Sequence, residues 1–393
     1  MSEDQFMGNL YQRFPVTIEK GEGSHVWDVD GKEYIDCMGG YGVALVGHKN
    51  KRVNDAIREQ IDKIITVHSS LYNKTREEFL ALLIGLAPKG LTQVHLNNSG
   101  AEAIEAAMKF ARKFTGKKSM VAMKGSYHGK SFGALSLTFN PKYRKPFAPL
   151  VEKVSFASYG DIESLRSVID EDTAFVILEP IQGESGIIVA PEGFLQEVRK
   201  ICDEKGILLI FDEIQAGLGR TGRLWACDHW NTAPDILCLA KGIAGGVPMG
   251  ATLVRPDILA SMSKGEHSST FGGNPISCAA GIAALKAITE DGLIENSEKM
   301  GKLFMEGLEK LKEKHSTIRE IRGKGLMIGI EMKFEIKDIL MELIKKGVLM
   351  LYSGRNIIRI LPPLVISEDD VTKVLHALDS VLTEEEEKRN VQG

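Results

Sequence analysis

The chain has 393 residues, of which 43% are hydrophobic, 26% charged and 7% aromatic, with 40 glycines and 13 prolines. This composition is typical of a globular protein and excludes a disordered chain, a collagen and a disulfide scaffold. The 49 basic and 53 acidic residues leave a net charge of −4, so no overall positive field is available to hold nucleic acid or an anionic membrane.

The five cysteines show no C-x-x-C spacing and no clustering with histidine, which predicts reduced thiols and no metal site. The first ten residues, MSEDQFMGNL, lack the basic region and apolar core of a secretion signal. No apolar run approaches the ~18 residues that a membrane span requires. We therefore expect a cytoplasmic protein that binds neither nucleic acid nor a membrane.

Near the start, the pattern predicts two strands, His25–Val29 and Glu33–Asp36, joined by a turn at Asp30-Gly31. This dipeptide is typical of a hairpin in which both turn positions need φ > 0. We expect residues 1–46 to form an N-terminal segment that packs with a smaller domain later in the chain.

The middle of the chain alternates short apolar runs with helical patterns, which is typical of a parallel sheet with crossover helices. Such strands are apolar throughout because both faces of the sheet are covered. We therefore expect a large α/β domain over residues 47–280. Its predicted strands are Gln93–Leu96, Met120–Met123, Lys153–Phe156, Ala174–Leu178, Ile207–Phe211, Ile236–Leu239 and Thr252–Val254, and its predicted helices are Ala101–Phe114, Ile162–Asp170 and Gly193–Lys205.

In the last part of the chain, the alternation of apolar runs and helical patterns predicts a smaller α/β domain over residues 281–393. The charge run at 384–389 has no apolar partner and is typical of a frayed, solvated tail. The predicted strands are Ile318–Ile321, Met327–Met332, Val348–Leu351 and Ile357–Leu361, with helices over 294–314, 335–346 and 368–383.

The run GILLIFDEIQAGLGRTG, at 206–222, ends a predicted strand with Asp212 and Glu213. Ligands of open α/β sheets bind at such carboxyl ends, so a carboxylate there is a site candidate. The glycines of GLGRTG, at 217–222, formally match a dinucleotide fingerprint. We reject that interpretation, because Asp212–Ala216 separates the strand from the first glycine and no helical period follows.

Lys241 comes directly after another predicted strand and before Gly242. Desolvation lowers the pKa of an amine, and the neutral amine attacks carbonyl groups to form a Schiff base. On this segment alone, a lysine that extends its amine into solvent is an equal alternative.

Ser99 directly precedes a predicted helix, with Gly100 and Ala101 next to it. Ser99 can cap the helix while Gly100 lets a ligand approach the backbone, which would make a phosphate site at the helix N-terminus. An ordinary helix cap explains this segment better when it is taken alone.

A phosphate-binding helix start, a strand-end aspartate and a strand-end lysine are together the parts that hold pyridoxal 5′-phosphate (PLP). The wider motifs are HVWDVDGKEYID (25–36), NNSGAEA (97–103), YHGKS (127–131), ILEPIQGESG (177–186), IFDEIQAGLGRTG (210–222), LAKGIAGGVPMG (239–250), STFGGNP (269–275) and IRILPPL (358–364). From about Gly21 to Leu364 the chain resembles the class III (ω-amino) aminotransferases of PLP fold type I. The resemblance implies their fold, a large mostly parallel-sheet domain with a smaller α/β domain.

The resemblance also implies a role for each matching residue. Lys241 would bind PLP covalently and act as general acid and base, and Asp212 would accept a hydrogen bond from the protonated pyridine nitrogen. The other implied cofactor contacts are Ser99, Gly100 and Ala101 at the phosphate, Tyr127 on the ring face, Gln215 near the phenolic oxygen and Thr270 from the other subunit of a homodimer.

Two substrates in one pocket require an anion-binding arginine that can be switched. In similar enzymes the arginine at the position of Arg359 binds the α-carboxylate of glutamate, and the glutamate at the position of Glu184 pairs with it when the other substrate is bound. A structural ion pair is the alternative for Arg359. Most relatives have an arginine at the position of Lys130, which here keeps the charge but loses the planar bidentate fork.

Within the family, the chain is most similar to acetylornithine aminotransferases and to lysine- and ornithine-biosynthesis enzymes whose substrate is attached to an amino-group carrier protein. The stretch 138–159 resembles the carrier-dependent branch. Its basic residues Lys142, Arg144 and Lys145 would steer an acidic carrier, although a solvated basic loop is the alternative.

We therefore predict an aminotransferase that moves the terminal amino group of an ornithine- or lysine-type substrate, linked to a carrier, to 2-oxoglutarate in lysine or arginine biosynthesis. The alternatives are an enzyme for free N-acetylornithine, an aminomutase or decarboxylase of the same fold, and a non-catalytic binding protein.

Overall fold

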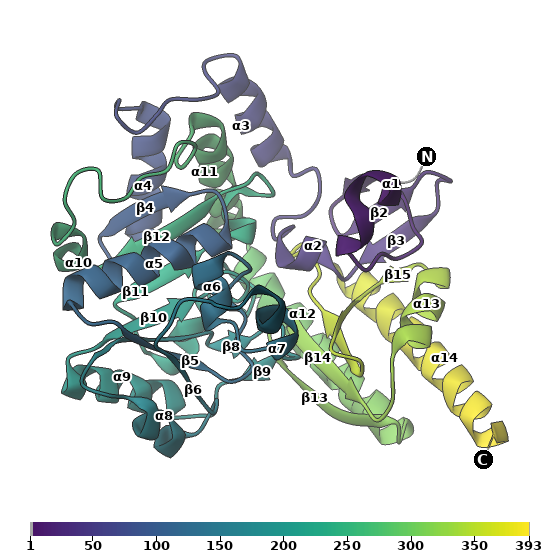
Figure 1. The fold of residues 1–393 in the computed structure, drawn as a ribbon. Coiled ribbons are helices and arrows are strands. Elements are labelled where there is room, and N and C mark those ends of the chain that lie inside the picture. The colour runs from purple at the N-terminus through teal and green to yellow at the C-terminus, as the bar shows by residue number, and fades with distance from the viewer. Residues whose placement is uncertain (1–2, 393) are drawn as a thin grey trace.

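The computed structural model describes residues 3–392 of the chain. A large α/β part is built around a seven-stranded sheet, and a smaller part contains two four-stranded sheets (Figure 1). The N-terminal strands and the C-terminal helix lie together on the smaller part (Figure 1).

The seven-stranded sheet has the order β4-β12-β11-β10-β7-β5-β6, and each strand overlaps one of the seven predicted strands. The sheet is mostly parallel, as predicted, but β12 runs antiparallel to both of its neighbours. Its central strands are buried along their whole length because helices cover both faces. The bounds are β4 (Gln93–Asn97), β5 (Ser119–Met123), β6 (Val154–Ala157), β7 (Thr173–Leu178), β10 (Leu208–Asp212), β11 (Ile236–Leu239) and β12 (Gly250–Val254).

The helices that cover this sheet include three that the sequence predicts: α5 (Gly100–Thr115), α8 (Ile162–Val168) and α9 (Phe194–Lys205). Three others have no counterpart in the prediction: α3 (Lys51–Ile61), α4 (Lys74–Leu86) and α11 (Pro275–Glu290). Helix α11 is buried on nearly all sides and therefore shows little helical periodicity. A Cβ on its Gly281 would lie 2.5 Å from a ring carbon of Phe79, so glycine is needed for α4 to approach.

The shorter elements of the large part connect these strands and helices. They are α6 (Phe132–Leu137), α7 (Pro141–Arg144), α10 (Pro256–Ala260) and the hairpin strands β8 (Ile181–Gln182) and β9 (Ile188–Val189), while α2 (Gly39–Gly42) follows β3 and lies between the two parts (Figure 1). The glycine-rich run after β10 opens no helix, in agreement with our rejection of a dinucleotide site.

The N-terminal strands β1 (Ile18–Glu22), β2 (His25–Asp28) and β3 (Glu33–Asp36) form an antiparallel sheet after a short helix α1 (Asp4–Met7). Strand β3 continues this sheet by pairing in parallel with β15 (Val348–Leu349). The expected turn conformation is wrong in one respect. Gly31 has a φ of 81°, but Asp30 keeps a negative φ, because the Asp28 carboxylate accepts the backbone N–H groups of Asp30 at 3.0 Å and Lys32 at 2.9 Å and so forms a longer turn.

The second small sheet has the order β13-β14-β17-β16, and α12 packs against its strand β13. Helix α13 packs against β15 of the first small sheet, and α14 packs against both α12 and α13. The predicted strand 348–351 divides at Met350 between β15 in one sheet and β16 in the other. The bounds are β13 (Ile318–Lys324), β14 (Met327–Met332), β16 (Leu351–Ser353), β17 (Ile357–Ile360), α12 (Leu293–Lys314), α13 (Lys337–Lys345) and α14 (Glu368–Gln392).

The prediction of a frayed tail at 384–389 is wrong, because α14 continues through it. The charged side chains find partners: Glu386 accepts hydrogen bonds from His315 at 2.9 Å and from the Thr317 hydroxyl at 2.7 Å. Arg389 lies 3.6 Å from the centre of the Phe334 ring.

The division of the chain at residues 46 and 280 stays a prediction. Between residues 3 and 392, no helix combines the length and the apolarity that crossing a membrane requires.

Candidate active site

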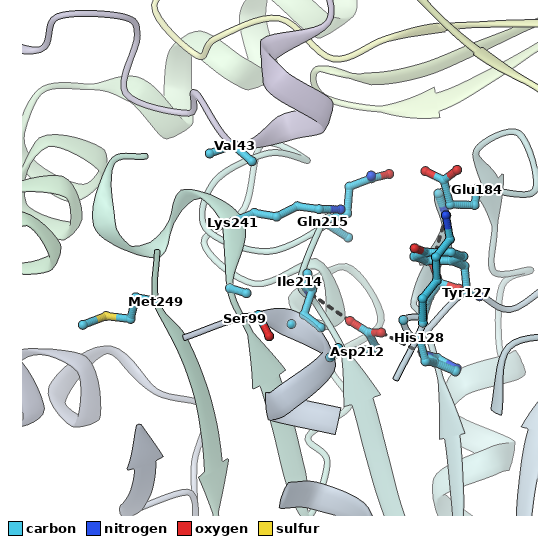
Figure 2. Close-up of a pocket in the computed structure, with 18 of the residues that line it drawn as sticks. Val43, Ser99, Tyr127, His128, Glu184, Asp212, Ile214, Gln215, Lys241 and Met249 are labelled. Carbon is cyan, nitrogen blue, oxygen red and sulfur yellow. Dashed lines mark hydrogen bonds and ion pairs between the residues drawn. The ribbon is translucent and has the colours of Figure 1, made fainter. Parts of the chain in front are cut away.

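The carboxyl ends of β5, β7, β10 and β11 meet beside the N-terminus of α5, at the edge where open α/β sheets bind ligands (Figure 1). A cavity of about 430 Å³ opens there. Nine of the predicted site residues line it: Ser99, Gly100, Ala101, Tyr127, Lys130, Glu184, Asp212, Gln215 and Lys241. Val43 comes from the N-terminal segment and lies across the cavity from the strand ends (Figure 2).

Lys241 follows β11 and has a φ of 50°, a left-handed conformation that costs a residue other than glycine about 1–3 kcal/mol. Such strained residues are concentrated at functional sites. The side chain extends across the cavity toward Gln215 (Figure 2). Burial lowers the pKa of the Lys241 amine, and the carboxylates of Glu184 and Asp212 partly oppose this shift. The amine therefore loses its proton at a lower pH than an exposed lysine does.

Asp212 is the last residue of β10 and is buried. Its Oδ2 lies 2.7 Å from Nδ1 of His128, and its Oδ1 accepts the backbone N–H of Ile214 at 3.0 Å (Figure 2). His128 is a residue that the prediction missed, although it stands next to Tyr127 in the YHGKS motif. The two hydrogen bonds fix the plane of the carboxylate.

Glu179 is a second residue that the prediction missed. It follows β7, and its carboxylate accepts the backbone N–H groups of Tyr127 and Gly183, each at 3.0 Å. Burial raises the pKa of this carboxyl group. The signal that marked Asp212, a carboxylate at the end of a buried strand, also marks Glu179. By connecting two loops of the cavity, Glu179 fixes their relative positions.

The N-terminus of α5 approaches the cavity closely. The Ser99 hydroxyl accepts the backbone N–H of Glu102 at 3.2 Å and so caps the helix. A Cβ on Gly100 would lie 2.9 Å from Cδ1 of Ile214, so a side chain there would disturb the cavity wall. The first N–H groups of a helix have no acceptor within the helix, and they suit an anion.

Arg359 lies on β17 and is fully buried. Its Nη1 donates to Oε1 of Glu184 at 2.7 Å and to the carbonyl of Gly183 at 3.1 Å, and its Nε donates to the carbonyl of Tyr352 at 3.1 Å. Its Nη2 has no hydrogen-bond partner in the described part of the chain. The guanidinium therefore keeps donor capacity that these neighbours do not use.

Tyr127 and Lys130 line the cavity on the side of Glu184, and Tyr143 packs against Tyr127. Burial raises the pKa of Tyr127 to about 12, so its hydroxyl keeps its proton. The ring of Tyr143 meets that of Tyr127 edge-on, with centroids 6.2 Å apart. The exposed Lys130 amine lies 5.0 Å from the centre of the Tyr143 ring.

The basic stretch beside Tyr143 does not act as one surface. The guanidinium of Arg144 packs on Phe156, 4.7 Å from the ring centre, whereas Lys142 and Lys145 are exposed. Thr270 is also exposed, and it lies outside the main cavity, on a neighbouring one of about 340 Å³. Within a single chain the structure does not bring Thr270 to Lys241.

The residues around the main cavity fit PLP. An amine of lowered pKa is available for an aldehyde, a buried carboxylate for a protonated ring nitrogen, and a helix N-terminus for a phosphate. Oε1 of Gln215 is buried with no partner among residues 3–392, as expected of a group that meets a polar ligand atom.

Comparison with known proteins gives consistent results. The family model for class-III aminotransferases matches residues 6–382. Acetylornithine aminotransferase of Methanopyrus kandleri is 45% identical over 381 residues, which cover 96% of this chain and 97% of that protein. LysW-aminoadipate semialdehyde transaminase of Deinococcus radiodurans is 44% identical over 384 residues, which cover 97% of this chain and 89% of that protein. The solved structure of ornithine aminotransferase from Toxoplasma gondii, which has partial occupancy of PLP, matches with a TM-score of 0.96 and 32% identity over 99% of this chain and 94% of that one.

Proposed function

The chain belongs to the class III aminotransferases, a PLP-dependent family, and from that premise we propose that it transfers the terminal amino group of an ornithine- or lysine-type substrate to 2-oxoglutarate. The observation that carries the proposal is the Glu184–Arg359 pair, 2.7 Å long, in which Glu184 lines the cavity that also contains Lys241 and Arg359 lies buried behind Glu184. An enzyme for one substrate has no need of a buried arginine that a carboxylate can cover and uncover.

We assign the cofactor contacts to residues that line the cavity. When bound, PLP withdraws electrons from the carbon that carries the amino group. Lys241 would hold its aldehyde and Asp212 its ring nitrogen. The other assigned contacts are Ser99, Gly100 and Ala101 at the phosphate, Tyr127 on the ring face and Gln215 near the phenolic oxygen.

Nζ of Lys241 is the group that we assign to proton transfer at the substrate carbon. A general base works best when its pKa lies near the working pH, and burial moves the Lys241 amine in that direction. Asp212 keeps one fixed orientation because His128 and the backbone N–H of Ile214 each donate to one of its oxygens. This arrangement supports a carboxylate of Asp212 that keeps its negative charge and its position while Lys241 transfers the proton.

Arg359 would bind the α-carboxylate of glutamate or 2-oxoglutarate when Glu184 turns away. When the other substrate enters, Glu184 would pair with Arg359 and remove its attraction for a second carboxylate. The pair thus allows one pocket to accept two substrates of different charge. An aminomutase or decarboxylase of the same fold would not need this exchange.

We propose that the terminal amine is carried by a substrate attached to an acidic carrier protein. LysW stands in the name of the Deinococcus radiodurans relative. Lys142 and Lys145 are exposed next to Tyr143, whose ring packs against Tyr127 in the cavity wall. Arg144 does not contribute, because it packs on Phe156. Lys130 would contact the substrate as a single-point cation. The Methanopyrus kandleri relative bears the name of the enzyme for acetylornithine, which keeps the free substrate as the second candidate.

We also propose a homodimer in which Thr270 of one subunit completes the phosphate site of the other. The exposed large apolar residues Leu71, Tyr72 and Phe271 lie near Thr270, around cavities on that side of the large part. Monomeric proteins rarely expose several large apolar side chains in one patch, so this patch supports a subunit interface. The five buried, free cysteines support a location in the reducing cytoplasm.

Three experiments test this function. Borohydride reduction of the holoenzyme followed by peptide mapping should place the pyridoxyl label on Lys241, and a label elsewhere overturns the assignment. Glutamate should convert the enzyme to its pyridoxamine form and release 2-oxoglutarate, and failure to do so removes the aminotransferase proposal. Turnover on free N-acetylornithine, carrier-bound lysine and carrier-bound ornithine then identifies the substrate, and a strong preference for the free compound removes the carrier.

A further inference from the structure

The turn that carries Glu184 is held by side chains of the small sheet through three of its backbone carbonyls. This turn, residues 183–187, joins β8 to β9. Main-chain carbonyls that are held in this way cannot follow a moving side chain. The hydrogen bonds run from Nη1 of Arg359 to the carbonyl of Gly183 at 3.1 Å, from the Ser353 hydroxyl to the carbonyl of Glu184, and from Nε of Arg322 to the carbonyl of Gly186 at 2.8 Å.

The three strands beneath the turn bring two of these donors into one row. Arg322 on β13 stands opposite Gly329 on β14, and Gly329 stands opposite Arg359 on β17. A Cβ on Gly329 would lie 2.8 Å from the carbonyl oxygen of Gly186 and 3.1 Å from Cβ of Ile187. The glycine therefore leaves a gap between the two arginines, and the turn occupies that gap.

The turn itself is shaped for this contact. Gly186 has a φ of 96°, and a Cβ there would lie 2.3 Å from Cδ1 of Ile357. From the opposite side, the Gly183 N–H donates to Glu179 at 3.0 Å. The backbone around Glu184 is therefore fixed from both sides, while the Glu184 side chain is only half-buried.

We propose that Arg322 and Ser353 are positioning residues for the two-substrate reaction. They hold the main chain of the turn on the β13-β14-β17-β16 sheet. The Glu184 carboxylate then reaches and leaves Arg359 only by rotation of the Glu184 side chain. This inference rests on the proposed function, because it assumes that Glu184 alternates between two positions. Without these residues the turn would drift, and Glu184 would cover Arg359 less completely.

Arg319 supplies a matched control. Arg319 and Arg322 lie on the same strand and both form ion pairs of 2.9 Å with Glu331. Only Arg322 also donates to the turn. Replacing either arginine by methionine removes a salt bridge to Glu331. Arg322→Met also removes the hydrogen bond to Gly186 and an ion pair of 2.7 Å with Glu320, whose side chain is exposed.

The kinetic test measures both half-reactions of the holoenzyme separately. Loss of one buried hydrogen bond corresponds to about a tenfold effect. We expect Arg322→Met and Ser353→Ala to lower kcat/KM for the terminal amine, measured with N-acetylornithine, by about fivefold to tenfold, and to change kcat/KM for glutamate by less than about twofold. Arg319→Met should leave both values as in the wild type. Equal losses in both half-reactions, or no loss, would overturn the proposal.

A double-mutant cycle separates positioning from a general structural effect. In a Glu184→Gln background there is no carboxylate left to position, so Arg322→Met should cause no further loss with the terminal amine. If the loss persists at full size, Arg322 does not act through Glu184 and the proposal is wrong.

Hydrogen exchange gives a readout that does not depend on turnover. The peptide that covers residues 181–189 should exchange faster in Arg322→Met than in the wild type, and no faster in Arg319→Met, both with and without PLP. Unchanged exchange in Arg322→Met overturns the proposal. If the wild-type enzyme reacts with neither glutamate nor a terminal amine, the proposed function fails, and this measurement alone then decides whether Arg322 holds the turn.

Discussion

Nδ1 of His128 lies 2.7 Å from Oδ2 of Asp212, and both side chains are buried beneath the cavity. The other oxygen of the carboxylate accepts the backbone N–H of Ile214. Each oxygen thus has a fixed donor, which makes His128 a residue that orients the negative charge rather than one that reacts.

Asp212→Asn should lower the rate of both half-reactions by about 10²–10³-fold, because the site loses a buried charge that is placed before the reaction begins. His128→Asn keeps a hydrogen-bond donor near the carboxylate and should cost about tenfold or less. Single-turnover absorbance measurements with glutamate give both rates, and PLP titration gives the affinities. Equal losses in the two variants would show that His128 does more than orient Asp212.

Glu184→Gln should separate the two substrates. Without its carboxylate the side chain covers Arg359 less well, so kcat/KM for the terminal amine should fall about tenfold while that for glutamate stays within about twofold of the wild type. Glu192→Gln, which changes an exposed glutamate, is the control. A parallel loss with both substrates would contradict a switching role for Glu184.

The stability of the protein should fall as the pH falls from 6.5 toward 4. Burial, followed by the charges of His267 and Lys109, lowers the pKa of His95 from 6.5 to about 4. In this range the unfolded chain binds a proton at His95 that the folded chain does not, so acid favours unfolding. His95→Gln should flatten the dependence of the free energy of unfolding on pH between these values. His376→Gln, at an exposed site, should leave it unchanged.

Reversing the charge of Lys142 and Lys145 together should raise KM for a carrier-bound substrate by about threefold to tenfold, because both residues would then repel an acidic partner. The effect should shrink at high salt, and free N-acetylornithine should be unaffected. Lys200→Glu, on the exposed face of α9, is the control. An unchanged KM for the carrier-bound substrate would remove this surface from the interaction.

Lys130→Arg should improve the use of free N-acetylornithine. A guanidinium offers two parallel donors to a carboxylate or carbonyl, and the lysine offers a single charge. We expect KM for the free compound to fall about threefold, with kcat little changed. Steady-state kinetics at fixed 2-oxoglutarate measure this, and an unchanged KM would show that Lys130 does not contact the substrate.

The strand-end residues of the site were the most predictable part of the molecule. Asp212 and Lys241 each follow a continuous apolar run, and such runs are read reliably because both faces of a central strand are covered. Glu179 carries the same signal, so sequence reasoning had the means to find it. His128 gives no such signal, because its partner Asp212 is 84 residues away in the chain.

Other features depended on contacts that no local pattern contains. Helix α11 is apolar on nearly every side, so periodicity does not mark it. The charged end of α14 looks solvated in sequence but is held by His315 and Thr317 from a distant connection. The hydrogen bonds from Arg322 and Ser353 to the turn of residues 183–187 join segments that are far apart in the sequence, so no local pattern predicts them.

The pairing of Ile35 on β3 with Val348 on β15 has a consequence for how the protein is made. The ribosome releases the first strand early, but its parallel neighbour emerges only near the end of synthesis. Until then the nascent chain carries an open strand edge, and such edges promote association with other chains. Until β15 has been made, the edge of β3 is therefore open to pairing with strands of other chains.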